Sequence, residues 1–163
     1  MPNERKDVRL PMWRKKMDAS MFDHRSTFVP HWVVDTVFGL RDTFPHSSKK
    51  DPRSLVEIEY RHPDRRITMH QGWVTTTRYE KGRGDVIRLF FDEGVFENLK
   101  DDFRMTYLRA MEKRHRGWNS PTAEREIPFW EFLDIEYDSR ECSFVFVPHY
   151  NLPPEGLERF THL

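Results

Sequence analysis

Acidic side chains at alternate positions are the first residues of this chain whose spacing could do chemistry. Asp51 precedes Glu57 and Glu59, and Asp134 with Glu136 repeats the alternation near the end of the chain. Clustered carboxylates can hold the divalent metal ions that assist phosphodiester cleavage. A common nuclease arrangement adds a lysine two residues after the second acid, and no lysine follows Glu59 at that distance. The alternation also fits the solvated face of a half-buried strand, which is the interpretation that we prefer.

Histidine, cysteine and glycine patterns do not indicate another kind of site. The eight histidines include no His-x₃-His or HExxH pair, the short spacings on which many zinc sites depend. Cys142 is the only cysteine, so an internal disulfide and a four-cysteine metal site are excluded. The glycine-containing segment 82–85 is not a phosphate-binding GxGxxG motif. We therefore predict no catalytic residue, no metal ligand and no cofactor.

Basic residues, by contrast, gather on two segments that also carry aromatic and hydroxyl side chains. We expect the first segment, residues 14–25, to be a loop, and the second, around residues 70–83, to contain the tip of a hairpin. Arginine pairs with guanine through two hydrogen bonds, while lysine and threonine suit phosphate oxygens. The candidate DNA-binding residues are Arg14, Lys15, Lys16, His24, Arg25, Trp73, Thr77, Arg78, Lys81 and Arg83.

The charge of the chain is balanced in total but segregated along the sequence. Lysine and arginine number 27, and aspartate and glutamate also number 27. Basic residues dominate segments 4–16 and 104–116, whereas acidic residues dominate segments 92–102 and 124–141. One face of the fold could therefore be basic although the sum is zero. The acidic segments also leave open a protein-interaction module that binds a basic partner.

Length and composition are those of one globular domain. The chain has 163 residues, of which 37% are hydrophobic and 14% aromatic, and this length can bury a core without disulfides. We expect a single domain over residues 1–163, with its core at about 10–150 and tails at 1–9 and 151–163. The first residues lack the apolar stretch of a secretory signal, and no apolar run has the length of a membrane span. We therefore expect a cytoplasmic protein without membrane contact.

Alternating hydrophobic residues predict strands joined by short turns. Residues 55–60 alternate apolar and acidic side chains, and a proline-containing turn after them predicts a hairpin over 55–70. Segments 72–79 and 85–91 are rich in strand-forming residues, and a second hairpin is expected over 132–147. Short turns between successive strands favour a mainly antiparallel sheet.

Two helices are expected between the strands. Residues 31–39 follow Pro30 and end at Gly39, which is typical of a short helix. From about Asp92 to His115, apolar residues recur at steps of three and four, with acids early and bases late, as the helix dipole favours. Together the elements predict an α+β, mainly antiparallel fold, a seven-stranded open pseudobarrel with two helices.

Five segments of the sequence carry the expected elements, and their order along the chain is informative. They are MWRKKM (12–17), STFVPHWVVDTVFG (26–39), LVEIEYRHPDRRITM (55–69), WVTTTRYEKGRGDVIRLFF (73–91) and DIEYDSRECSFVFV (134–147). This order resembles the DNA-binding pseudobarrel of plant B-three domains and of restriction-enzyme recognition domains such as the N-terminal effector domain of EcoRII. The resemblance implies two arms, residues 14–25 and about 73–83, that grip the major groove of double-stranded DNA. It also implies that no residue of the fold is catalytic and that a separate nuclease domain or subunit does any cutting.

We therefore predict a sequence-specific double-stranded DNA-binding domain that reads the major groove with two basic loops and serves as the recognition module of a restriction-type system. Two alternatives stay open. One is a metal-dependent nuclease or nucleotide-acting enzyme that uses Glu57, Glu59 and Asp134. The other is a protein-interaction module that uses the acidic segments.

Overall fold

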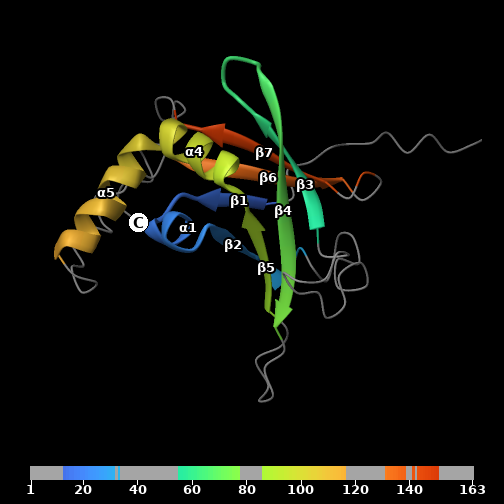
Figure 1. Ribbon diagram of the computed structural model, residues 1–163, viewed down its shortest axis with the longest axis horizontal. Coiled ribbons are helices and arrows are strands. Elements are labelled where there is room, and N and C mark those ends of the chain that lie inside the picture. The colour runs from blue at the N-terminus through green and yellow to red at the C-terminus, as the bar shows by residue number, and fades with distance from the viewer. Residues whose placement is uncertain are drawn as a thin grey trace, which may run out of the picture.

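Seven strands and three helices make up the part of the chain that the structure describes (Figure 1). The computed structural model describes residues 13–31, 33, 55–77, 86–116, 131–138, 141 and 143–150. In chain order the elements are β1 (Trp13–Lys16), α1 (Ala19–His24), β2 (Ser26–Val29), β3 (Leu55–Arg61), β4 (Ile67–Thr77), β5 (Val86–Phe91), α4 (Glu93–Asp102), α5 (Arg104–Arg116), β6 (Phe132–Asp138) and β7 (Ser143–His149).

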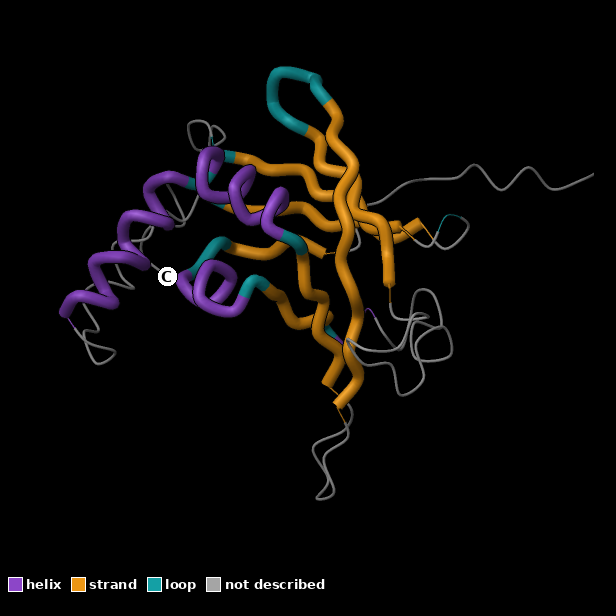
Figure 2. The backbone as a smooth tube through the Cα atoms, in the orientation of Figure 1, coloured by secondary structure: helices purple, strands orange, loops and turns teal. Residues whose placement is uncertain are grey.

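The strands form one sheet that curls into a half-barrel (Figure 2). Their spatial order is β1-β6-β7-β3-β4-β5-β2. Among these strands five pairings are antiparallel, and β3 with β7 is parallel, with Glu57 opposite Ser143. The predicted α+β fold with a mainly antiparallel, seven-stranded open sheet is therefore confirmed.

The two edges of the sheet, β1 and β2, are neighbours along the chain. A single short helix, α1, separates them, so the chain leaves one edge and returns at the other. The sheet stays open between these edges, because no ladder of backbone hydrogen bonds joins β1 to β2. We call this opening the seam.

Alternation along the strands decides which residues form the core. On β3, Val56, Ile58 and Tyr60 are buried, while Glu57 is exposed on the opposite face. Burying such an apolar side chain contributes about 1.5–3 kcal/mol to folding. Other fully or almost fully buried residues are Met21, Val74, Ile87, Leu89, Phe91, Val95, Leu99, Phe103, Leu133, Ile135, Phe144 and Phe146. Strands and helices therefore contribute to a single core.

Residues 14–25, predicted to be a loop, are instead the end of a strand followed by a short helix. Asp18 has extended backbone, and its carboxylate accepts a hydrogen bond from the backbone N–H of Met21 (3.2 Å), which caps the first turn of α1. Met21 and Phe22 are buried, and the Phe22 ring meets the Tyr107 ring of α5 edge-on at 5.4 Å. The loop prediction is wrong because a helix of six residues offers too few periodic positions to be recognised.

The long helix predicted from about residue 92 to 115 is two helices. Phe103 leaves helical geometry (φ −109°, ψ 50°), so that α4 ends just before it and α5 begins just after it. The carboxylate of buried Glu131 accepts hydrogen bonds from the backbone N–H of Thr106 (3.0 Å) and from the Thr106 hydroxyl, and thereby caps the first turn of α5. The one helix predicted here is therefore two helices, and α1 is a further helix that was not predicted.

Both predicted hairpins are present, with one difference in the first. β4 runs unbroken over Ile67–Thr77 and joins segments that were predicted to be two strands. The helix predicted over 31–39 is helical at His31 and Val33, and its remaining residues lie outside the described part of the chain.

Candidate nucleic-acid interface

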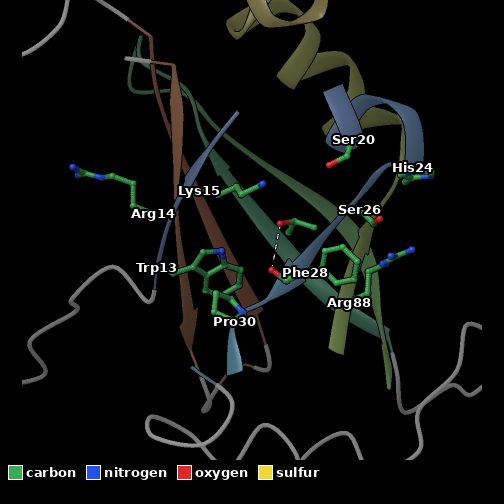
Figure 3. A pocket seen from close by; sticks show the side chains of 10 residues that line it. Trp13, Arg14, Lys15, Ser20, His24, Ser26, Phe28, Pro30 and Arg88 are labelled. Carbon is green, nitrogen blue, oxygen red and sulfur yellow. Dashed lines mark hydrogen bonds between the residues drawn. The ribbon is translucent and has the colours of Figure 1, made fainter. Parts of the chain in front are cut away.

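A pocket of about 260 Å³ opens at the seam (Figure 3). Its lining comes from both edge strands, from α1 and from β5. The lining residues are Trp13, Arg14, Lys15, Ser20, His24, Ser26, Thr27, Phe28, Pro30 and Arg88. Three of these residues are permanently cationic, but Arg14 pairs with Asp134 and Lys15 pairs with Asp18. Arg88 is therefore the lining cation that no described carboxylate pairs with, and it is available to an anionic ligand.

Lys15 is the cation that β1 directs across the seam toward α1 (Figure 3). Its ammonium group donates a hydrogen bond to Asp18 Oδ2 at 2.5 Å, and the Ser20 hydroxyl donates to Asp18 Oδ1 at 2.6 Å. Burial alone would raise the pKa of the Asp18 carboxyl, but the hydrogen bonds from Lys15, Ser20 and Met21 outweigh burial and hold that pKa below its usual value. The carboxylate thus fixes both the helix start and the position of Lys15.

Arg14 points away from the seam pocket in Figure 3, although it was predicted to contact DNA. Its guanidinium donates two hydrogen bonds to the Asp134 carboxylate (2.8 and 3.0 Å) and lies 4.1 Å from the centre of the Phe132 ring. The hydrogen bonds to Asp134 raise the pKa of Arg14, against a smaller opposing effect of burial. His149 Nε2 also lies 3.1 Å from Asp134 Oδ2. Arg14 is therefore held in an ion pair on the outside of β1.

The remaining basic residues predicted for the first arm fall into two groups. Lys16 and His24 are exposed, and no carboxylate of the described residues pairs with either of them. Arg25 follows α1 with left-handed backbone (φ 49°), forms an ion pair with Glu93, and places its guanidinium 4.5 Å from the Phe96 ring. Lys16 and His24 are thus available to a ligand, whereas Arg25 is directed to α4.

Arg88 on β5 is a site residue that was missed in the sequence. It lies in a segment noted for apolar residues, but strand alternation puts it on the outer face, opposite inward-facing Ile87 and Leu89. Its guanidinium lies 4.2 Å from the Phe28 ring and 5.9 Å from the Phe90 ring. Alternation within 86–91 was the signal that could have identified it.

A second pocket, of about 410 Å³, lies beside the seam pocket, and His24 lines both. Its lining residues are His24, Arg25, Trp73, Thr75, Phe90, Phe91, Asp92 and Glu93. Trp73 was predicted as a site residue, and its ring stacks on that of Phe90 with centres 5.3 Å apart and planes 3° apart. The two carboxylates already have structural partners, since Asp92 caps α4 through the Val95 N–H (2.9 Å) and Glu93 pairs with Arg25.

Most of the second predicted arm lies outside the described part of the chain. Arg78, Lys81 and Arg83 lie outside the described residues, and the side chain of Thr77 is not described either. The backbone of Thr77 is paired with that of Val86, so the arm begins and ends on two paired strands. The role of these four residues stays a prediction.

The acidic residues proposed as metal ligands are not gathered into a site. Glu57 is exposed, Glu59 accepts a hydrogen bond from Arg61 Nε (2.7 Å), and Asp134 is paired with Arg14. Within the described ranges, no three His, Cys, Asp or Glu side chains cluster as a metal site would require. The enzyme alternative therefore gains no support from these residues.

A polar cluster beside the first hairpin was also missed in the sequence. His62 Nε2 and His70 Nε2 lie 2.8 and 2.7 Å from the Thr68 hydroxyl oxygen, and the Asn98 amide nitrogen lies 3.1 Å from His70 Nε2. An amide nitrogen only donates, so His70 Nε2 accepts and carries no proton. Burial lowers the pKa of His70, and the nearby Asp92 only partly opposes this effect. The arrangement therefore disfavours the protonated form of His70.

Comparison with protein-family models, curated proteins and solved structures finds no match to this chain. The resemblance to DNA-binding pseudobarrels therefore continues to rest on the order of the elements. No helix in the described part combines the length and apolar character needed to cross a membrane.

Proposed function

We propose that this protein binds double-stranded DNA through the seam and the β4–β5 arm, without cutting it. The observation that supports this most is the seam pocket, which brings His24 and Arg88 together with Lys15, whose ammonium group is held by Asp18, and whose described lining contains no carboxylate. Cationic side chains gathered in this way match the phosphates of a nucleic acid, which supply most of its non-specific affinity.

The segregation of charge explains how a chain of zero net charge can serve this role. Several acids of segment 92–102 are used within the fold: Asp92 caps α4, and Asp102 accepts a hydrogen bond from the Tyr60 hydroxyl at 2.6 Å. Arg88 on β5 lines the seam pocket, and the exposed Lys16 lies on the edge strand β1, on the same outer face as Arg14. Phosphates would therefore meet a locally positive surface.

In this proposal β1 and α1 form the first arm. The second arm is the segment between β4 and β5, which contains Arg78, Lys81 and Arg83 in sequence. We propose that the two arms enter the major groove, where arginine and lysine read guanine edges. In the same proposal the chain is the recognition module of a restriction-type system, and a nuclease domain or subunit is its partner.

A salt titration of duplex binding tests the proposal. Each phosphate contact adds about −0.9 to the slope of log affinity against log salt concentration. We expect Lys16→Ala, Arg88→Ala and Arg83→Ala each to make the slope less steep by about one contact. Arg104→Ala, which removes an exposed arginine at the start of α5, is the matched control and should leave the slope unchanged. Duplex affinity that ignores salt, or that drops as much in the control, would contradict the proposal.

A further inference from the structure

Four planar side chains cross the outer face of β4, β5 and β2 in contact with one another. We call them the stacking ladder: Trp73, Phe90, Arg88 and Phe28. The strand registers place Trp73 opposite Phe90 and Phe28 opposite Arg88. The rings of Trp73 and Phe90 stack at 5.3 Å, and the Arg88 guanidinium lies 4.2 Å from the Phe28 ring and 5.9 Å from the Phe90 ring. The ladder spans three strands, or roughly 10 Å.

The side chains of the ladder are partly or largely exposed, although folded proteins usually bury aromatic rings. Phe28 is 55% exposed, and Trp73, Arg88 and Phe90 are partly exposed. Figure 3 shows the Phe28 ring beside Arg88 at the seam pocket. Phe28 and Arg88 line the seam pocket, while Trp73 and Phe90 line the second pocket. The ladder therefore connects two hollows of the same surface.

The chemistry of these side chains is that of a stacking platform. Every nucleobase has a flat face that stacks on aromatic rings, and arginine guanidinium groups stack on bases as well. Paired bases inside a duplex offer their edges to a protein, because their faces are covered by neighbouring base pairs. A ladder of ring faces thus fits bases that have left the stack, and the carboxylate-free seam pocket beside it fits the attached phosphates.

We infer that the stacking ladder binds the faces of unpaired nucleobases. This inference rests on the proposed function for the phosphate contacts, and it adds a ligand class, since the proposed function concerns paired DNA. The bases can come from single-stranded nucleic acid or from a duplex with one base displaced.

The test compares three labelled oligonucleotides of one sequence by fluorescence anisotropy: a single strand, a perfect duplex, and a duplex with one bulged nucleotide. We expect the wild-type protein to bind at least one unpaired form about fivefold or more tighter than the perfect duplex, because stacking one base is worth about 1–3 kcal/mol. A preference for the single strand identifies a strand as the source of the base, and a preference for the bulge alone identifies a displaced base.

The variants separate ring stacking from general affinity. Phe28→Leu keeps an apolar side chain but removes the ring, so it should abolish the preference for unpaired forms, measured as the ratio of the variant's own affinities for the unpaired forms and the perfect duplex. Phe28→Tyr keeps a ring and should keep the preference. Met69→Leu, at an exposed apolar position of β4 outside the ladder (54% exposed), is the control and should behave as wild type.

Two results overturn the inference: equal affinity for all three forms, or an unchanged preference in Phe28→Leu. Equal affinity for all three forms, together with the salt dependence expected for phosphate contacts, refutes only the inference about the stacking ladder. If the protein binds none of the three forms at any salt concentration, the proposed function is refuted as well.

Discussion

Two basic residues of β1 are expected to have different roles: Arg14 a structural one and Lys16 a role in DNA binding. They are two residues apart and so lie on the same face, but of the two only Arg14 has an ion-pair partner among the described residues. We predict that Arg14→Ala lowers the free energy of unfolding, whereas Lys16→Ala mainly weakens DNA binding.

The contacts of Arg14 set the size of the stability effect. Its side chain is 60% exposed, so solvent screening limits the ion pair with Asp134 to about 1 kcal/mol. The contact with the Phe132 ring adds about 0.5–1 kcal/mol. Asp134 keeps His149 at 3.1 Å, which reduces the cost of losing the arginine. The expected loss is therefore about 1–2 kcal/mol for Arg14→Ala, against less than about 0.5 kcal/mol for Lys16→Ala.

Equilibrium unfolding in urea measures the first effect, as a lower midpoint at an unchanged m-value. Fluorescence anisotropy with duplex DNA measures the second. One lost phosphate contact should weaken binding about eightfold at 0.1 M salt. The reasoning is refuted if Arg14→Ala unfolds at the wild-type midpoint and loses as much DNA affinity as Lys16→Ala.

Two further predictions concern the sheet and its neighbouring helix. The folded protein holds the pKa of His70 below 6.5, its value in the unfolded chain. The free energy of unfolding should therefore be complete above pH 6.5 and fall as the pH drops through 6.5 and below. His70→Gln should flatten this trend in urea midpoints measured from pH 7.5 to 5. A Cβ atom on Gly72 would lie 2.4 Å from the Phe90 carbonyl oxygen. Gly72→Ala should therefore lower the free energy of unfolding by about 1–3 kcal/mol, because it forces β4 and β5 apart. A variant that melts at the wild-type temperature would contradict that close approach.

The sequence predicted those parts of the fold that depend on local patterns. Val56, Ile58 and Tyr60 alternate with acids, and the structure buries the first set on β3. The two hairpins followed because their turns are short. The open, mainly antiparallel sheet followed in turn from the order of the strands.

Features that depend on distant partners could not be predicted in this way. Arg14 and Asp134 are 120 residues apart, so nothing near Arg14 in the sequence announces that it is already paired. The interruption at Phe103 is likewise hidden, because apolar residues keep their helical spacing across it and the capping carboxylate comes from Glu131. The candidate site could not be predicted for the same reason. Its lining comes from β1, α1, β2 and β5, and only the curl of the sheet brings these elements together.

The place of β1 at one edge of the sheet has a consequence for synthesis on the ribosome. Its strand partner, β6, is translated more than a hundred residues later, so the first strand emerges into solution with no neighbour to receive its backbone hydrogen bonds. Pairings between such distant segments form slowly, since a large loop must close before any contact is gained. A nascent chain that stops before β6 can join β3, β4, β5 and β2 but lacks one wall of the opening. The surface between the two edges is therefore completed only after β6 has been translated.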